Sequence, residues 1–343
     1  MIKISLAIAP IIACLVFQVA AIADEQRSSQ IVLQAIDKVF KPTSIALQEN
    51  TRALDAALKM DCWSSTARKT FKNTVAVFSE IEYYRLGAIN QQNRAERLFF
   101  WPDRKATGQK QLRRLLQDPK RDLLDTQALA KKSVALQGLP ALEAILFSKK
   151  ADYNAKDCLV AQAIGGNINN IAAQIKQDWF AQQGIATQLS KGSKQSLYRS
   201  NTEAMAAILT LSESALISLS EKKLGLIIDG LKQWQSIPKS APFWRSDMTL
   251  NHLGGNLLSI EHLLIATGIA KIAGVEATLK FEFRTANSML DAAKNAFASA
   301  EIKTMANRLL ALKLIIDGMQ TTLAETISPA LGVSTGFNSS DGD

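Results

Sequence analysis

The chain has 343 residues, with 40 lysines and arginines against 31 acids and a formal net charge of +9 at pH 7. This length is enough for two domains. A basic chain often binds nucleic acid or anionic lipid. Here, however, the basic residues are spread along the chain with acids between them, and we find no basic tract or nucleic-acid motif. This pattern argues against nucleic-acid binding.

Residues 1–23 have the composition of an export signal. One positive charge, Lys3, precedes an apolar core over residues 4–17, and Ala21-Ile22-Ala23 forms a small-residue cleavage site. Cleavage near Ala23 would leave 343 minus 23, or 320, residues in the periplasm. After the signal we find no run of ~18 to 20 uninterrupted apolar residues, the length of a membrane span, so we expect the mature protein to be soluble.

An alternative takes residues 11–14 as a lipoprotein box, with Cys14 as the lipid-bearing residue. The residues that follow Cys14 stay apolar up to Ala23, which fits a continuing hydrophobic signal better than a lipidated N-terminus. We therefore favour a cleaved signal over a lipid anchor.

Helical periodicity dominates the rest of the chain. Apolar residues such as Ile164, Ile168, Ile171 and Ile175 recur at the three-and-four spacing of one buried helix face, whereas strand alternation is nearly absent. The pattern predicts an all-α protein. The predicted helices cover residues 27–59 (irregular at Pro42), 65–90, 123–134, 139–149, 155–183, 194–219, 221–235, 249–270, 272–298 and 300–326.

Long amphipathic helices joined by short polar turns bury their apolar stripes most readily as up-and-down bundles. The stretch over residues 184–196 is rich in glycine, serine and lysine and is typical of a boundary. We predict two packed bundles, an N-terminal one over residues 24–190 and a C-terminal one over residues 191–335, followed by a tail over residues 336–343.

Two cysteines, Cys62 and Cys158, follow the signal. Cysteines of an exported chain most often pair because the compartment is oxidising. A bridge between them would be worth about 4 kcal/mol in the loop-entropy model. The alternative is two unpaired buried thiols; neither residue lies in a CxxC pattern, which argues against metal binding or redox chemistry.

Two short echoes relate the halves. Residues 100–103 (FWPD) resemble residues 243–247 (FWRSD), and residues 142–146 (LEAIL) resemble residues 260–264 (IEHLL). In each half an aromatic loop precedes a helix that carries one acid in an apolar stripe. The echoes are consistent with an ancient duplication, although each is short enough to arise by chance.

Glu143 is the leading candidate functional residue. It is a single carboxylate in an apolar run, and Gly138 and Pro140 precede it as residues suited to a helix start. Near the start of a helix the macrodipole favours a carboxylate, so a purely structural role and a ligand-binding role both remain open. If Glu143 is buried, it needs a cation or a strong donor opposite it.

Candidate partners lie in both halves. Arg85 and the aromatic loop with Trp101 and Asp103 belong to the first, while Arg245 and the helix with Glu261 belong to the second. Taken singly, each charged residue is more often found on a solvated surface, and Trp101 and Trp244 are more often packing anchors than ligand contacts. The chain lacks HExxH, GxSxG and a phosphate-binding glycine loop, and its two histidines cannot form a histidine-rich metal cluster.

Five segments of the chain together resemble the imelysin-like family, once classified as M75 peptidases and tied to bacterial iron uptake. The resemblance spans the mature chain and is carried by residues 85–87 (RLG), 93–103, 138–143, 243–246 and the ending 336–343. It implies a fold of two packed helical bundles with the hallmark motif near their interface.

The family hallmark is Gly-x-His-x-x-Glu, which places an imidazole and a carboxylate on one helix face as a plausible metal-binding pair. Gly138 and Glu143 match it, but Pro140 stands at the histidine position. Proline offers no imidazole, so we doubt that the chain is a peptidase and assign it no catalytic residues.

The resemblance therefore leads us to expect a non-catalytic periplasmic protein that binds a ligand between its bundles in iron acquisition, with iron, an iron chelate or another divalent metal as the ligand. The predicted site consists of Arg85, Trp101, Asp103, Gly138, Pro140, Glu143, Arg245 and Glu261, with Glu143 as the best metal candidate. Two alternatives remain: a metallopeptidase with a site rearranged around His252, His262 or carboxylates, and an interaction protein that docks on an outer-membrane transporter without a small ligand.

Overall fold

The computed structural model describes residues 24–118, 120, 124–148, 154–191 and 197–333. Over these residues the chain is all-α, without a strand, as its periodicity predicts. The predicted signal, Cys14 and the tail over residues 336–343 lie outside the described residues.

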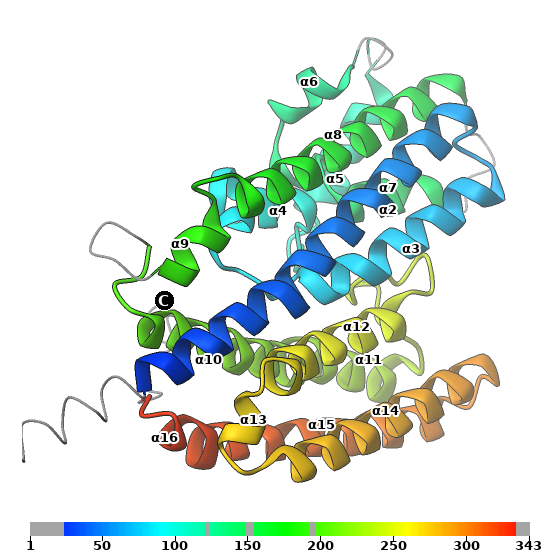
Figure 1. Ribbon diagram of the computed structural model, residues 1–343. Coiled ribbons are helices and arrows are strands. Elements are labelled where there is room, and N and C mark those ends of the chain that lie inside the picture. The colour runs from blue at the N-terminus through cyan, green and yellow to red at the C-terminus, as the bar shows by residue number, and fades with distance from the viewer. Residues whose placement is uncertain (1–23, 119, 121–123, 149–153, 192–196, 334–343) are drawn as a thin grey trace, which may run out of the picture.

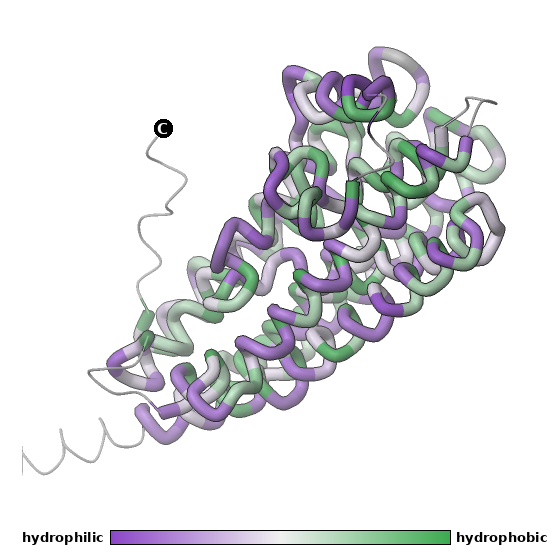
Figure 2. The backbone as a smooth tube through the Cα atoms, turned by 90° about the horizontal axis from the view of Figure 1, so that it is seen from above, coloured by the Kyte–Doolittle hydropathy of each residue, from purple (hydrophilic) through white to green (hydrophobic). Residues whose placement is uncertain are grey.

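The helices form two packed bundles (Figure 1). The first is built on α2 (Lys41–Met60), α3 (Ser65–Ile81) and α8 (Ala155–Phe180). The second is built on α10 (Asn201–Ile217), α11 (Leu226–Trp234), α12 (Thr249–Glu261), α14 (Glu276–Ala298) and α15 (Ile302–Thr322). Hydrophilic and hydrophobic residues are interspersed along the helices, as expected when one face of a helix is buried (Figure 2).

The main seam between the bundles is the packing of α12 against α3. Gly255 permits the close approach, because a Cβ at this position would lie 2.5 Å from the Ser79 side chain and 3.2 Å from the Ala76 carbonyl oxygen. The seam thereby brings the polar residues of α12 within hydrogen-bonding distance of those at the end of α3.

The N-terminal helix also joins the bundles. Residues 24–35 continue through a π-helical turn, η1 (Ile36–Phe40), into α2. The Glu25 carboxylate accepts hydrogen bonds from the backbone N–H groups of Asn201 (2.8 Å) and Thr202 (3.3 Å), at the start of α10. It supplies the negative charge that the first turn of α10 favours. Residues near the start of the predicted N-terminal bundle therefore contact the C-terminal one.

The predicted helix boundaries differ from the observed ones mainly in the first bundle. The helix predicted over residues 65–90 ends at Ile81, and the chain then turns through the 3₁₀ helix η2 (Gly87–Ile89), whose Gly87 has φ +55°. The helix predicted over residues 123–134 is only α6 (Thr126–Ala130), followed by the 3₁₀ helix η5 (Val134–Leu136). The helices α4 (Arg94–Leu98), α5 (Thr107–Gln117) and α9 (Ile185–Lys191) were not predicted, and the last of them lies in the stretch predicted as a boundary.

In the second bundle the break predicted at residue 220 and the helix end predicted at residue 326 both fall in π-helical turns, and a further π turn lies inside the helix predicted over residues 249–270. The helix from α10 to α11 is continuous through η6 (Ser218–Gly225), and α12 continues through η7 (His262–Ala266). The short helix α13 (Ile269–Ile272) then precedes α14, and α15 continues through η8 (Leu323–Ile327) into α16 (Ser328–Ala330). A π turn widens the helix by one residue without breaking it, so apolar periodicity alone does not reveal it.

One helix of the described chain, Asn201–Gln233, is long and apolar enough to cross a membrane by length and composition. Half of its apolar window is buried inside the protein, where it contacts α12 and α15. These contacts are those of a core helix in a bundle.

The predicted disulfide is confirmed. Cys62, just after α2, is bonded to Cys158 in α8, and their Cα atoms lie 5.6 Å apart. The bridge links α2 and α8 near one end of the first bundle.

Candidate functional site

A cavity of about 80 Å³ lies where the first and second bundles meet. Its walls come from the loop after α4, from α5, from the start of α7 (Leu139–Leu146) and from the loop before α12. Five of the eight predicted site residues line it: Trp101, Asp103, Pro140, Glu143 and Arg245. The two aromatic loops that echo each other in sequence thus lie at one cavity.

The start of α7 places Glu143 in this cavity. Gly138 is the N-terminal cap of α7, and a Cβ there would collide with the carbonyl oxygens of Arg97 and Leu98. Its role is therefore to let α7 begin against α4, and it does not line the cavity. Pro140 lies in the first turn, where the missing N–H has no helical partner to lose.

Glu143 is a buried carboxylate, 3% exposed, and it faces the second bundle. Its Oε1 accepts hydrogen bonds from the backbone N–H (2.9 Å) and the hydroxyl (2.7 Å) of Ser246. Burial raises the pKa of Glu143, while the Ser246 hydrogen bonds and the positive charge of Arg245 act in the opposite direction, and the net shift is upward. Ser246 is the strong donor that a buried acid requires, and sequence reasoning did not single it out.

Two cations lie over one indole ring beside the acid. The Arg245 guanidinium is 4.3 Å from the centroid of the Trp244 ring, and the Lys239 ammonium is 5.9 Å from it. Burial lowers the pKa of Arg245, and the Glu143 charge partly opposes this shift. Arg245 is half-buried in the cavity wall, where its guanidinium places a positive charge next to the carboxylate.

The first aromatic loop serves mainly to build the cavity wall. The Trp101 indole N–H donates to the Ser240 carbonyl (2.9 Å), which ties the loop to the second bundle. Asp103 accepts hydrogen bonds from the backbone N–H groups of Thr107 (2.6 Å) and Gly108 (3.0 Å) at the start of α5. Its carboxylate is thereby used as a helix cap.

Arg85 and Glu261 are not brought to the cavity. Arg85 lies in the loop after α3, where its exposed guanidinium faces the exposed Glu96 at 3.4 Å. Glu261 is the half-buried last residue of α12, and burial raises its pKa. The sequence echo between Glu143 and Glu261 therefore does not bring two acids into one site.

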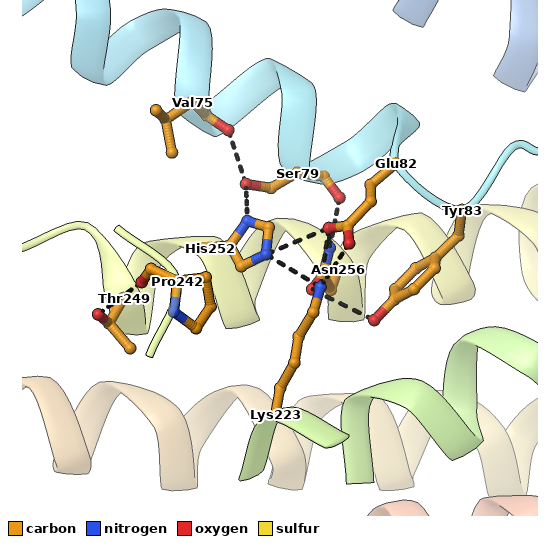
Figure 3. Close-up of polar contacts among 9 residues, drawn as sticks. All are labelled: Val75, Ser79, Glu82, Tyr83, Lys223, Pro242, Thr249, His252 and Asn256. Atoms are coloured by element: carbon orange, nitrogen blue, oxygen red, sulfur yellow. Dashed lines mark hydrogen bonds and ion pairs between the residues drawn. The ribbon is translucent and has the colours of Figure 1, made fainter. Parts of the chain in front are cut away.

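A second polar cluster, which we call the Lys223 network, lies buried in the seam (Figure 3). Four acceptors surround the ammonium of Lys223, in η6: both carboxylate oxygens of Glu82 (2.8 Å each), Asn256 Oδ1 (2.6 Å) and His252 Nε2 (2.9 Å). Its three N–H groups donate to them, with one N–H shared between two acceptors. Lys223, His252 and Asn256 are fully buried, and Glu82 is 6% exposed. The network joins the end of α3 to η6 and α12.

We assign the histidine tautomer from its hydrogen-bond partners; His252 Nε2 also lies 3.1 Å from Glu82 Oε2. The Ser79 hydroxyl donates to the Val75 carbonyl (2.6 Å), so its oxygen is left to accept from His252 Nδ1–H at 2.6 Å. His252 Nε2 then carries the lone pair that accepts from Lys223. The imidazole is neutral in this arrangement.

The pKa shifts agree with an ammonium and carboxylate pair beside a neutral imidazole. Burial alone would raise the pKa of Glu82, but the Lys223 charge holds it well below its ordinary value. Burial lowers the pKa of Lys223, and Glu82 opposes that shift. Burial lowers the pKa of His252 to about 4, and the Lys223 charge acts in the same direction.

Acidification from pH 6.5 to pH 4 should therefore destabilise the protein through His252. The unfolded histidine, with a pKa of about 6.5, binds a proton in this window while the folded one does not, so the free energy of unfolding falls as pH falls. The shift to about 4 corresponds to about 3 kcal/mol. Urea unfolding across this range should show a shallower pH dependence for His252→Gln than for the wild type; identical slopes would contradict the assignment.

Stacked aromatic rings separate the Lys223 network from the cavity. Phe99 and Phe243 line the cavity and stack on each other at 5.2 Å between ring centroids. The His252 ring packs behind both, at 5.5 Å from Phe99 and 5.0 Å from Phe243. The Lys223 ammonium lies 5.9 Å from the Phe99 centroid. The network thus supports the wall of the cavity from the protein interior.

Sequence reasoning considered His252 but missed its partners. The available signal was Lys223, which lies four residues after Leu219 and four before Ile227, on one apolar stripe of a helix. A lysine in such a stripe requires a buried acid opposite it. The sequence did not indicate which acid this would be.

A histidine or carboxylate metal centre is not found among the residues that the structure describes, where no group of three or more His, Cys, Asp or Glu side chains is arranged to hold an ion. His252 is engaged in the Lys223 network, and His262 is half-buried at the start of η7. Neither histidine lines the cavity that contains Glu143.

The comparisons with known proteins agree with this architecture. The family model described as imelysin, of the peptidase M75 group, matches residues 41–330. The crystal structure of an imelysin-like protein from Psychrobacter arcticum 273-4 is similar in fold, with a TM-score of 0.68 at 14% sequence identity, over 91% of this chain and 98% of that one. A search among curated proteins gave no significant match. Because the family model covers most of the chain and the fold agrees, the protein belongs to the imelysin family.

Proposed function

We propose that the protein is an exported, non-catalytic binding protein of the periplasm, linked to iron acquisition, and that it holds a small ligand in the cavity between its bundles. The observation that carries the proposal is Glu143: a buried carboxylate that lines a cavity, with Oε1 held by Ser246. Both Ser246 hydrogen bonds engage Oε1, and the backbone N–H of Arg245 also acts on the carboxylate, so a ligand with a donor or a cation would bind at the Oε2 side.

The size of the cavity limits what enters it. A site of about 80 Å³ holds a few water-sized groups, at roughly 10 to 15 Å³ for each water. It therefore suits one polar head group or a hydrated ion and not an entire haem. Aromatic walls and the cations on Trp244 would contact the remainder of a larger ligand outside the cavity.

The metal-binding side chains of the cavity favour a metal that arrives already chelated by a small molecule over a free ion held by the protein alone. A resident zinc or non-haem iron ion is held by three protein ligands, whereas the cavity offers Glu143 and an Asp103 that already caps α5. Iron would accordingly be held here as a chelate, with Glu143 as one contact. The iron link itself rests on the family, and no observation on the site favours the peptidase alternative.

Substituting Glu143 with glutamine should weaken ligand binding at least tenfold, because a charge-assisted hydrogen bond is worth about 1.5 to 3 kcal/mol. Calorimetry of the purified protein with ferrous iron, ferric citrate and haem is the measurement. Glutamine keeps an oxygen for Ser246, so the loop before α12 should stay in place.

The matched control is Glu261→Gln, which neutralises a half-buried acid outside the cavity and should leave binding unchanged. Equal affinity of the wild type and Glu143→Gln for every probe would remove Glu143 from the site. Loss of binding in both variants would point to an effect of net charge.

A further inference from the structure

The acceptors around Lys223 form a four-atom cage. Both oxygens of Glu82, Asn256 Oδ1 and His252 Nε2 lie 2.6 to 2.9 Å from the ammonium nitrogen. Carboxylates, amide oxygens and imidazole nitrogens are all groups that bind metals. Here two carboxylate oxygens, one amide oxygen and one imidazole nitrogen surround the same point (Figure 3). In this chain that point is occupied by the ammonium of Lys223.

Each acceptor is oriented by a further hydrogen bond. His252 Nδ1–H donates to Ser79, which leaves the Nε2 lone pair directed at the cage. The Asn256 amide donates to the Ser79 carbonyl (2.7 Å) and to Glu82 Oε2 (3.1 Å), which directs its own oxygen inward. Outer hydrogen bonds of this kind fix the tautomer and orientation of metal-binding histidines.

The cation and its acceptors come from different elements. His252 and Asn256 are four residues apart on one face of α12, and Glu82 ends α3. Lys223 alone comes from η6, across the second bundle. Shortening its side chain would therefore remove the cation and leave the acceptors on their own backbones.

We propose that Glu82, His252 and Asn256 form a metal-type site that is permanently closed by the ammonium of Lys223. The wild-type protein takes up no metal at this point, and removal of the ammonium opens a site for a first-row divalent ion such as Co²⁺ or Zn²⁺. The ion replaces the ammonium charge, Glu82 and His252 bind it directly, Asn256 adds an amide oxygen, and water fills the space of the lysine stem. The rings of Phe99 and Phe243 separate this site from the Glu143 cavity.

The proposal is tested by titrating Co²⁺ into three purified proteins: the wild type, Lys223→Ala and Lys59→Ala. Bound Co²⁺ is measured by metal content after dialysis and by its visible absorption. Lys223→Ala should retain about one equivalent more than the wild type. Lys59→Ala removes an exposed charge that pairs with the buried Asp55, away from the Lys223 network, and should retain no more Co²⁺ than the wild type. Adding Glu82→Gln or His252→Ala to Lys223→Ala should lower Co²⁺ affinity roughly tenfold or more, whereas adding Glu143→Gln should not.

Lys223→Met, which keeps most of the stem volume, is measured in parallel because Lys223→Ala leaves a buried charge unpaired. If either variant is unfolded without metal, recovery of helical circular dichroism on addition of Co²⁺ supports the site, since an ion that binds only the folded state stabilises it. The proposal is overturned if neither variant gains Co²⁺ or structure over the wild type. It is also overturned if the wild type binds Co²⁺ in a way that Glu82→Gln abolishes.

Discussion

Replacing Lys223 with alanine, in the presence of a chelator, should lower the free energy of unfolding by about 3 to 5 kcal/mol. The ammonium is fully buried and donates to Glu82, His252 and Asn256, so its removal leaves an uncompensated carboxylate in the seam between the bundles. The whole network loses its shared donor. Urea unfolding followed by circular dichroism measures the effect.

Two further variants show whether the lost stability comes from the buried unpaired charge or from the missing side chain. Lys280→Ala removes an exposed lysine from its surface pair with Glu276. Surface pairs of this kind contribute less than about 1 kcal/mol, so the stability of this variant should stay close to that of the wild type. Lys223→Met combined with Glu82→Leu replaces both charges with apolar groups and should recover much of the loss. If Lys223→Ala lowers the free energy of unfolding by less than about 1 kcal/mol, the pair of Lys223 and Glu82 is not desolvated in solution.

Removing the disulfide should cost about 4 kcal/mol, because the bridge between Cys62 and Cys158 closes a loop of sequence separation 96 in the unfolded chain. The double variant Cys62→Ala/Cys158→Ala is compared with the wild type in urea without reductant. The helices it links, α2 and α8, also pack directly on each other, so the variant should keep its helical content at low urea.

Reductant serves as the internal control for this prediction. It should lower the wild-type midpoint to near that of the double variant and leave the double variant unchanged. A wild-type midpoint that does not respond to reductant, together with a double variant of equal stability, would show that the two cysteines are unpaired in the purified protein.

The residues that the first aromatic loop and α7 contribute to the candidate site could largely be predicted from the sequence. Glu143 stood out because a lone carboxylate in an apolar helix must find a donor, and Trp101, Asp103 and Arg245 followed from the paired aromatic loops. The structure places these residues on one cavity. Their specific contacts, such as the Ser246 hydrogen bonds to Glu143, depend on how the loop before α12 approaches α7 and are not encoded in local spacing.

Arg85 and Glu261 illustrate the limit of reasoning from sequence echoes. Arg85 lies only a few residues after Glu82, yet the turn that ends α3 directs it to the surface while Glu82 points into the seam. Glu261 matches Glu143 in sequence context, but it ends α12 instead of starting a helix at the cavity. Proximity along the chain and similarity of motif do not fix the direction in which a side chain points.

The sequence by itself determined the all-α class, the two bundles and the cysteine pair, because helical periodicity is a local property and only two cysteines follow the predicted signal. Only the tertiary structure decided which polar residues meet. Glu82, Lys223 and Asn256 are separated by up to 174 positions, and they form one network because Gly255 lets α12 pack closely against α3. A buried charge requires a partner, but the packing of helices selects it.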